Sequence, residues 1–353
     1  IVLKSLAEEY HLAMAYYYLG CLLYDRRVYD ESIEDYEESI LRSPDFPTVH
    51  RNLALAYYNV KKLPQRAYEE MEKAFALDET DARVYLELDQ LKKRLNVAVK
   101  ERWSDMEKHF DLVESRDDLY LEYVTLLNTL GEPEKALGLI KARKFHQWEG
   151  GEGKVAAQYL TALYQLAKAA VEKEDYAEAK ELLLRAVGEY PHNLGEGKLE
   201  SGQENNLYYL LGLVQEKLGE TEEAFVNLTK ACYGESEPVG MMYYNDQPPE
   251  MIYYQGLAYR MLGEEEQAVR RFQKLVDYGR EHIRDDVKID YFAVSLPDLL
   301  IFEENLNERN RKHCLFMMSL GLKGLGRIDE AEKCAEELLA MDNAHQEIRV
   351  HDL

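Results

Sequence analysis

A short glycine–alanine signature that recurs along the chain limits its fold more than any other feature. Copies of Gly-x-x-x-x-Ala run from Gly131 to Ala136, Gly219 to Ala224, Gly263 to Ala268 and Gly326 to Ala331. Apolar residues follow each copy at intervals of three or four, as on one face of a helix. Glycine often ends one helix, and a small alanine lets the next helix pack closely, so each copy predicts the turn of a helical hairpin. Repeated hairpins predict an all-α repeat fold, and a helical bundle with chance similarity explains them poorly.

Eight such units can be placed on the sequence. Small or bulky residues that mark their first helices are Leu19-Gly20, Leu53-Ala54, Tyr85, Leu121, Leu166-Ala167, Leu211-Gly212, Gly256 and Met318-Ser319. The pattern resembles the tetratricopeptide repeat (TPR), a helix-turn-helix unit of about 34 residues. The resemblance implies a right-handed α-solenoid of about eight hairpins. Its third repeat, from about Ala82 to Glu114, is degenerate, with an amphipathic second helix predicted through Trp103, Met106 and Phe110. The turn of the second repeat carries one extra residue.

The later repeats are spaced more widely than the TPR period. Ala136 to Ala179 is 43 residues, Ala179 to Ala224 is 45, and Ala224 to Ala268 is 44. We place the extra length between hairpins, in insertions at 192–206, 233–249 and 277–311. The last should hold a further helix beginning near Pro297, because proline suits a first helical turn. We therefore expect one solenoid over 1–353, with three repeats in 1–116, four in 117–276, the insertion 277–311, and the last repeat and tail in 312–353.

Charge and cysteine content exclude several classes of partner. The net charge of −24 repels phosphate backbones and anionic lipids, so neither nucleic acid nor a membrane is expected as a partner. The four cysteines, Cys21, Cys232, Cys314 and Cys334, form no Cys-x-x-Cys pair and suit neither a zinc site nor a disulfide framework. We expect a reducing, cytoplasmic location and no cofactor or metal.

The segments between the later repeats carry a narrower resemblance. They read HQWEGGEGK at 146–154, PHNLGEGK at 191–198 and DYFAVSLPDLLIFE at 290–303. Together they are similar to the C-terminal TPR region of large bacterial proteins in which a β-rich domain of unknown function precedes the repeats. The resemblance implies that the chain is the helical part of a longer protein cut at Ile1. It also implies an upstream part related to carbohydrate-processing β-sandwich folds.

Two Gly-Glu-Gly-Lys runs, at 151–154 and 195–198, could be mistaken for phosphate-binding loops. A phosphate loop needs Ser or Thr after the lysine and a strand before the loop, and neither run has them. Two interpretations remain: tight turns that join repeats, or a shared edge that contacts a partner or ligand. The second would use Trp148, Glu152, Lys154, Glu196 and Lys198.

Aromatic side chains recur at one position of the first helices. In TPR arrays this position, the fifth of the repeat, points to the concave face. It is occupied here by Tyr17, Arg51, Leu121, Tyr164, Tyr209, Tyr253 and Phe316, and Tyr24 and Tyr58 add to the row at position 12. Tyrosine offers a large contact area at low entropic cost, so the row predicts a surface for an extended peptide or a docked domain. Packing of the same rings between neighbouring repeats is the alternative, and both stay open.

Sequence motifs of catalysis are absent. The chain has no Gly-x-Ser-x-Gly elbow and no His-Glu-x-x-His. Tyr17 and Cys21 also replace the lysine and asparagine with which some TPR proteins clamp acidic tails. We therefore predict a non-catalytic scaffold whose partner is a protein, a peptide or the upstream domain of the same polypeptide. The alternatives are an accessory region that completes the site of an upstream carbohydrate-active domain, or self-association through a solenoid end; the oligomeric state is not predicted.

Overall fold

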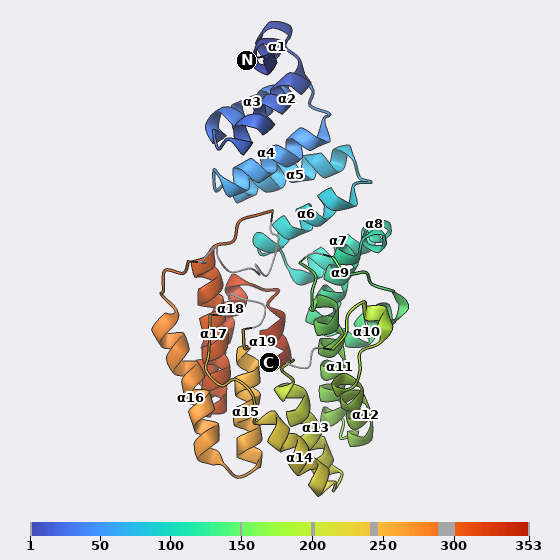
Figure 1. Cartoon of the computed structure of the whole chain (residues 1–353), viewed down its shortest axis with the longest axis vertical. Coiled ribbons are helices and arrows are strands. Elements are labelled where there is room, and N and C mark those ends of the chain that lie inside the picture. The colour runs from blue at the N-terminus through green and yellow to red at the C-terminus, as the bar shows by residue number, and fades with distance from the viewer. Residues whose placement is uncertain (1, 149, 199–201, 241–245, 289–300, 352–353) are drawn as a thin grey trace. The chain divides into compact units, whose positions relative to one another are not determined.

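The computed structural model describes residues 2–148, 150–198, 202–240, 246–288 and 301–351 (Figure 1). Those residues form helices with no β-strand among them, which confirms the all-α prediction. The chain divides into two compact units, each treated below by itself. Unit 1 consists of Ile1–Val97, Ser104–Leu119 and Leu300–Glu304, and unit 2 of Ala98–Trp103, Tyr120–Leu299 and Asn305–Leu353.

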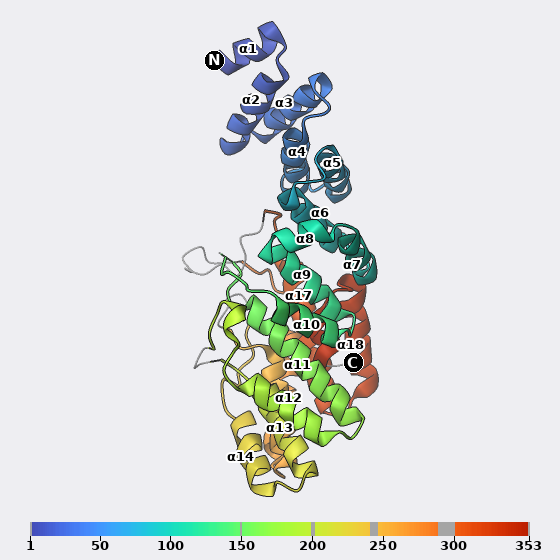
Figure 2. The same ribbon diagram turned by 90° about the vertical axis from the view of Figure 1, so that its right-hand side faces the viewer.

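The predicted eight hairpins are present in the described part of the chain. In order they are α2 (Ala13–Asp25) with α3 (Tyr29–Arg42), α4 (Pro47–Asn59) with α5 (Pro64–Leu77), α6 (Ala82–Arg94) with α7 (Val99–Lys108), α9 (Asp117–Thr129) with α10 (Pro133–Ala142), α11 (Lys154–Glu172) with α12 (Tyr176–Val187), α13 (Asn205–Lys217) with α14 (Thr221–Ala231), α15 (Pro249–Met261) with α16 (Glu265–His282), and α17 (Leu306–Gly324) with α18 (Ile328–Met341). Outside the pairs lie α1 (Val2–Tyr10), α8 (Phe110–Ser115), the 3-10 turn η1 (His192–Leu194) and α19 (Gln346–His351). Figure 2 shows α9 to α14 following one another along unit 2.

All eight hairpin turns share one backbone conformation. Each contains a residue in the left-handed region, at Arg27, Lys62, Asn96, Gly131, Glu174, Gly219, Gly263 and Gly326. The N–H of the following residue then donates a hydrogen bond to the carbonyl five residues earlier, as from Glu132 to Leu127 at 2.9 Å. In the second hairpin the bond reaches six residues back, from Leu63 to Tyr57, which confirms the extra residue predicted there.

Small residues in the first helices let the second helices pack closely. A methyl group on Gly20 would lie 2.7 Å from the Tyr36 ring, and one on Gly256 would lie 2.5 Å from Phe272. Both distances are far below van der Waals contact, so these positions accept no side chain without movement. In these two hairpins a glycine of the first helix therefore lies directly against an aromatic ring of the second helix.

The helix boundaries differ from prediction in two places. The second helix of the third repeat was predicted to run through Phe110, but α7 ends at Lys108 and the chain turns at His109, whose ring lies 5.3 Å from that of Phe75. The third insertion was predicted from Asp277 to Arg311, but both residues lie inside helices. Gly279 explains the longer α16, because a methyl group there would lie 2.5 Å from Met318 Cγ of α17. The further helix predicted near Pro297 lies outside the described residues.

The described helices contain no segment that is both long and apolar enough to cross a membrane. The four cysteines are free thiols. Burial raises the pKa of Cys314 to about 12 and that of Cys232 to about 11, so neither is a reactive thiolate at neutral pH.

Candidate functional site

The first helices of the hairpins in unit 2, α9, α11, α13, α15 and α17, form what we call its inner face, and the short helix α19 lies against it (Figure 1). Gln346, at the start of α19, makes the contacts at one end. Its side-chain amide donates to the Thr125 carbonyl and to Thr129 Oγ1, both at 3.1 Å. Gln158 Nε2 donates to Gln346 Oε1 at 2.9 Å. A single glutamine thus joins α19 to both α9 and α11.

The other end of α19 is held by α11 and α15. Lys168 Nζ donates to the Val350 carbonyl at 2.7 Å, and the hydroxyl of Tyr254 lies 3.0 Å from His351 Nδ1. Between the two ends, the side chain of Ile348 is fully buried. A helix of six residues is not stable alone in water, so these contacts are what hold α19 helical.

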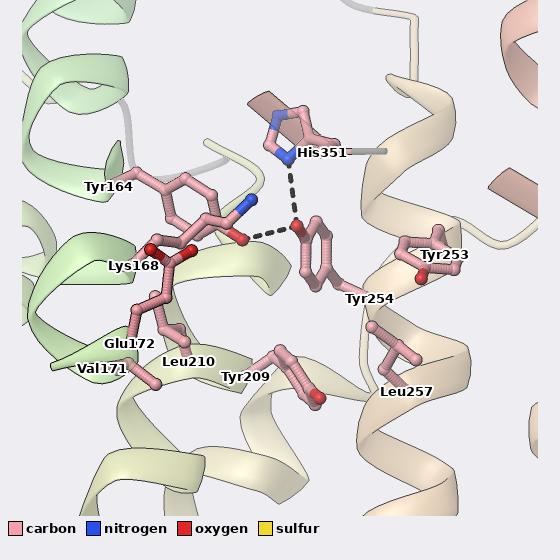
Figure 3. Close-up of a pocket in the computed structure, with 10 residues that line it drawn as sticks. All are labelled: Tyr164, Lys168, Val171, Glu172, Tyr209, Leu210, Tyr253, Tyr254, Leu257 and His351. Atoms are coloured by element: carbon pink, nitrogen blue, oxygen red, sulfur yellow. Dashed lines mark hydrogen bonds between the residues drawn. The ribbon is translucent and has the colours of Figure 1, made fainter. Parts of the chain in front are cut away.

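A pocket of about 230 Å³ opens beside the last turn of α19 (Figure 3). Three tyrosines predicted from the sequence line it, and each comes from a different first helix: Tyr164 from α11, Tyr209 from α13 and Tyr253 from α15. The other lining residues are Lys168, Val171, Glu172, Leu210, Tyr254, Leu257 and His351. The fold therefore brings Tyr164 and Tyr254, 90 residues apart in the chain, into one aromatic site. Tyr254 and His351 belong to this site but were not predicted from the sequence.

The polar groups at the base of the pocket are uncharged at neutral pH. The hydroxyls of Tyr164 and Tyr254 lie 2.5 Å apart. Burial raises the pKa of both phenols, while burial, and then the charge of Lys168, lowers the pKa of His351 to about 3. The Tyr254 hydroxyl bonds to Tyr164 on one side and to the neutral His351 imidazole on the other, so this group is suited to hydrogen bonding and not to proton transfer near neutral pH. Charge is confined to Lys168 and Glu172 at the pocket wall.

Several residues of the predicted aromatic row in unit 2 are buried by packing. Phe316 is buried, and its ring lies 5.2 Å from that of His345. Leu121 is also buried. Tyr164 and Tyr253 are buried as well, whereas Tyr209 is only half-buried. Tyr209 is therefore the most exposed residue of the row in unit 2 and the one most accessible to a partner.

The row in unit 1 divides in the same way. The Tyr17 ring packs 6.4 Å from Tyr36 within its own hairpin and 5.0 Å from Phe46, which directly precedes α4 of the next repeat. Arg51 forms a two-pronged ion pair with Glu87, at 2.5 and 2.6 Å. These contacts join α4 to α6.

Tyr24 and Tyr58, the position-12 tyrosines, are half-buried near the ends of α2 and α4. The ring of Tyr24 contacts Tyr29 at 5.2 Å, and that of Tyr58 contacts Phe302 at 5.1 Å. Phe302 belongs to a distant segment of the chain.

The two Gly-Glu-Gly-Lys segments meet each other. The Glu196 carboxylate accepts the backbone N–H groups of Gly153 at 2.7 Å and Ala156 at 2.8 Å, and thereby caps the start of α11. Lys198 Nζ donates to the Val187 carbonyl at 2.6 Å. These inward contacts favour the interpretation as structural turns for Glu196 and Lys198.

The remaining predicted loop residues lie near the first of these segments. The ring of Trp148 covers Gly151, where a methyl group would lie 2.3 Å from the indole. Glu152 and Lys154 are exposed. Only these last two therefore present their side chains mainly to solvent, and Glu149 is outside the described residues.

No group of three or more His, Cys, Asp or Glu side chains in the described chain is placed to hold a metal ion. One buried acid stands out. Glu250, in the first turn of α15, is only 8% exposed, and burial raises its pKa to about 8. The negative charge of Glu347 adds to this rise, and no nucleophilic side chain is among the groups that act on the pKa of Glu250.

Comparison with known proteins identifies the repeats. Tetratricopeptide repeat family models match residues 17–82, 161–193, 206–233 and 250–278. These four segments are recognised as tetratricopeptide repeats. The matches cover α2 to α5, α11 with α12, and α13 to α16, so they include the three helices that supply Tyr164, Tyr209 and Tyr253. TPR domains generally serve as non-catalytic scaffolds for protein interaction.

Several solved structures are similar to this chain at low sequence identity. A tetratricopeptide repeat protein from Parabacteroides merdae is 13% identical over 74% of this chain and 91% of that chain, with a TM-score of 0.39. A structure of Naa15/Naa10 bound to HypK-THB is 10% identical over 98% of this chain and 56% of that chain, with a TM-score of 0.44. Yeast Tom70 is 14% identical over 96% and 77%, with a TM-score of 0.30. The predicted upstream β-rich domain and the bacterial, cytoplasmic setting stay predictions.

Proposed function

We propose that the chain is a non-catalytic interaction scaffold that binds a peptide segment of a partner protein on the inner face of unit 2. The observation that carries the proposal is α19. This short helix is held on that face by side chains of α9, α11 and α15 that bond to its glutamine, its carbonyl groups and its histidine. A face that orders six residues of its own chain has the chemistry needed to order a peptide from another.

The pocket beside α19 supports a protein partner better than a small molecule. Its volume of about 230 Å³ is below the ~300–1,000 Å³ typical of small-molecule sites, and is of the size that accepts one side chain. Four tyrosines line it. Tyrosine-rich pockets with few charges are typical of binding hot spots. We propose that an apolar or aromatic side chain of the partner enters between Tyr209 and Tyr253.

We propose the predicted upstream domain of the same polypeptide as a second source of the bound peptide segment. The predicted alternative, an accessory role for a carbohydrate-active domain, depended on exposed Gly-Glu-Gly-Lys loops. Because Glu196 and Lys198 bond to the scaffold itself, the described residues lend that alternative no specific support.

Selection from a displayed peptide library, followed by titration with purified variants, tests the proposal. Peptides that bind the chain should lose at least about tenfold in affinity for Tyr209→Ala, because truncating a tyrosine at a binding hot spot typically costs about 2 kcal/mol or more. The matched control is Tyr233→Ala, since Tyr233 is 68% exposed and outside the pocket. Failure to select any binder, or equal loss with both variants, would remove the assignment of this face.

A further inference from the structure

A distant segment of the chain is bound in unit 1 as an extended peptide would be. Residues 301–304 are not helical, and they lie against the ends of α4 and α6. The side chain of Phe302 is only 1% exposed, and its ring meets that of Tyr58 edge-on, with centroids 5.1 Å apart. One aromatic anchor, buried against a tyrosine predicted from sequence to bind a partner, thus fixes the segment.

The main chain on both sides of this anchor is held by one asparagine. Asn59 Nδ2 donates to the Ile301 carbonyl at 2.7 Å, and Asn59 Oδ1 accepts the N–H of Glu303 at 2.8 Å. A primary amide used this way bonds to the peptide backbone as a neighbouring β-strand would. Arg94 adds a third main-chain bond, from its guanidinium to the Phe302 carbonyl at 3.3 Å. Main-chain bonds of this kind set the direction and register of a peptide without limiting its sequence.

Side-chain selectivity comes from two contacts. The buried ring of Phe302 selects an aromatic residue, and Lys62 Nζ pairs with the Glu303 carboxylate at 2.6 Å. Both members of this ion pair are about two-thirds exposed, so it adjusts affinity and does not dominate it. Tyr24 completes the site, since Asn59 and Glu303 are among the groups that act on its hydroxyl. Lys62 and Arg94 place positive charge here in a chain of net charge −24.

We propose that this surface of unit 1, formed by Tyr24, Tyr58, Asn59, Lys62 and Arg94, is a binding site for extended peptides of a partner protein in which an acidic residue follows phenylalanine. Ile301-Phe302-Glu303 is its intramolecular occupant. Every contact above is made to backbone atoms, to one ring or to one carboxylate, so a peptide from another protein can make all of them. The inference stands on unit 1 alone, whereas the proposed function rests on unit 2, and each can fail without the other.

The test must account for Ile301-Phe302-Glu303, which competes with any free peptide for the same site. A tethered segment has an effective concentration in the millimolar range, so the wild-type chain should bind a free peptide weakly. The probe is a fluorescein-labelled peptide of residues 300–306, Leu-Ile-Phe-Glu-Glu-Asn-Leu, titrated with the full chain and followed by anisotropy. Phe302→Ala should bind it at least tenfold more tightly than the wild type. The matched control, Phe225→Ala, changes a phenylalanine of unit 2 that is 61% exposed, and it should bind like the wild type.

Specificity is checked in the Phe302→Ala chain. Adding Asn59→Ala should abolish binding, and a probe with alanine in place of phenylalanine should not bind. If the folded Phe302→Ala chain binds no more tightly than the wild type, or if Asn59→Ala has no effect, the segment is a structural strap and the proposal is overturned. If circular dichroism shows that Phe302→Ala does not fold, the variant Glu303→Lys is used for the test instead. This exposed substitution sets two lysines together, so it should bind the probe more tightly than the wild type; equal binding overturns the proposal.

Discussion

Gly324→Ala in α17 should destabilise the chain, although alanine is normally the better helix former. A methyl group on Gly324 would lie 2.2 Å from Cδ1 of Phe272, a ring in α16 that is fully buried. The ring cannot move away freely, because Gly256 of α15 also approaches it, and a methyl group there would lie 2.5 Å from Cε1. Phe272 therefore fills a space defined by two glycines on two first helices.

The size of the effect follows from two opposed contributions. Overpacking a dense core costs about 1–3 kcal/mol, and glycine-to-alanine in a helix gains about 0.5–1 kcal/mol. The net expectation for Gly324→Ala is a loss of up to about 2.5 kcal/mol, centred near 1 kcal/mol. Gly138 in α10 provides the control, because it is exposed and a methyl group there meets nothing within 4 Å. Gly138→Ala should therefore raise stability by up to about 1 kcal/mol.

Urea unfolding followed by far-ultraviolet circular dichroism measures both variants. The expected result is a lower midpoint for Gly324→Ala and an unchanged or higher midpoint for Gly138→Ala. Adding Phe272→Leu to Gly324→Ala should cost less than the sum of the two single changes, since the smaller side chain makes room for the methyl group. Equal midpoint shifts for the two glycine variants, or strict additivity in the double variant, would refute the packing argument.

Two further predictions concern a buried acid and a capping acid. Glu250 has its pKa raised from 4.5 to about 8 by burial, so the native state holds a proton that the unfolded state releases above pH 4.5. The contribution of Glu250 to stability is therefore lost as pH rises through about 8. In thermal melts Glu250→Gln should have the melting temperature of the wild type near pH 4.5 and a higher melting temperature than the wild type at pH 9. The same difference in melting temperature at both pH values would contradict this prediction. Glu196→Ala should lower stability by about 0.5–2 kcal/mol, because it removes the cap on two N–H groups of the first turn of α11. Glu152→Ala, on an exposed residue of the neighbouring loop, should have no such effect in the same melts, and equal losses would argue against the cap.

Local pattern was enough to predict the hairpins but not all of their turns. Apolar spacing and small–large pairs are set by neighbours in sequence, so eight hairpins could be placed. The glycine signature located only half of the left-handed turn residues, because Arg27, Lys62, Asn96 and Glu174 hold the same conformation without glycine. The two helices that a turn joins impose that conformation.

Long-range contacts explain what the sequence could not show about the sites. Tyr254 and His351 enter the pocket because α15 approaches α11 and α19 folds back on both, and no local signal encodes either approach. Phe302 likewise packs on Tyr58, about 240 positions earlier in the chain, and its sequence neighbours carry no signal of that contact. The position-5 row identified the right helices, but whether each ring packs or binds depends on these approaches.

Amide hydrogen exchange across α19 tests most directly whether the inner face of unit 2 orders a peptide. An isolated helix of six residues is unstable in water, so protection of its last amides can come only from docking on α9, α11 and α15. We predict slow exchange at Val350 and His351 in the wild-type chain, and faster exchange in Gln346→Ala, which loses the bonds to Thr125, Thr129 and Gln158. Exchange at the rate of an unstructured peptide in the wild type would contradict the account, because the face would then not hold the one segment that shows it can bind.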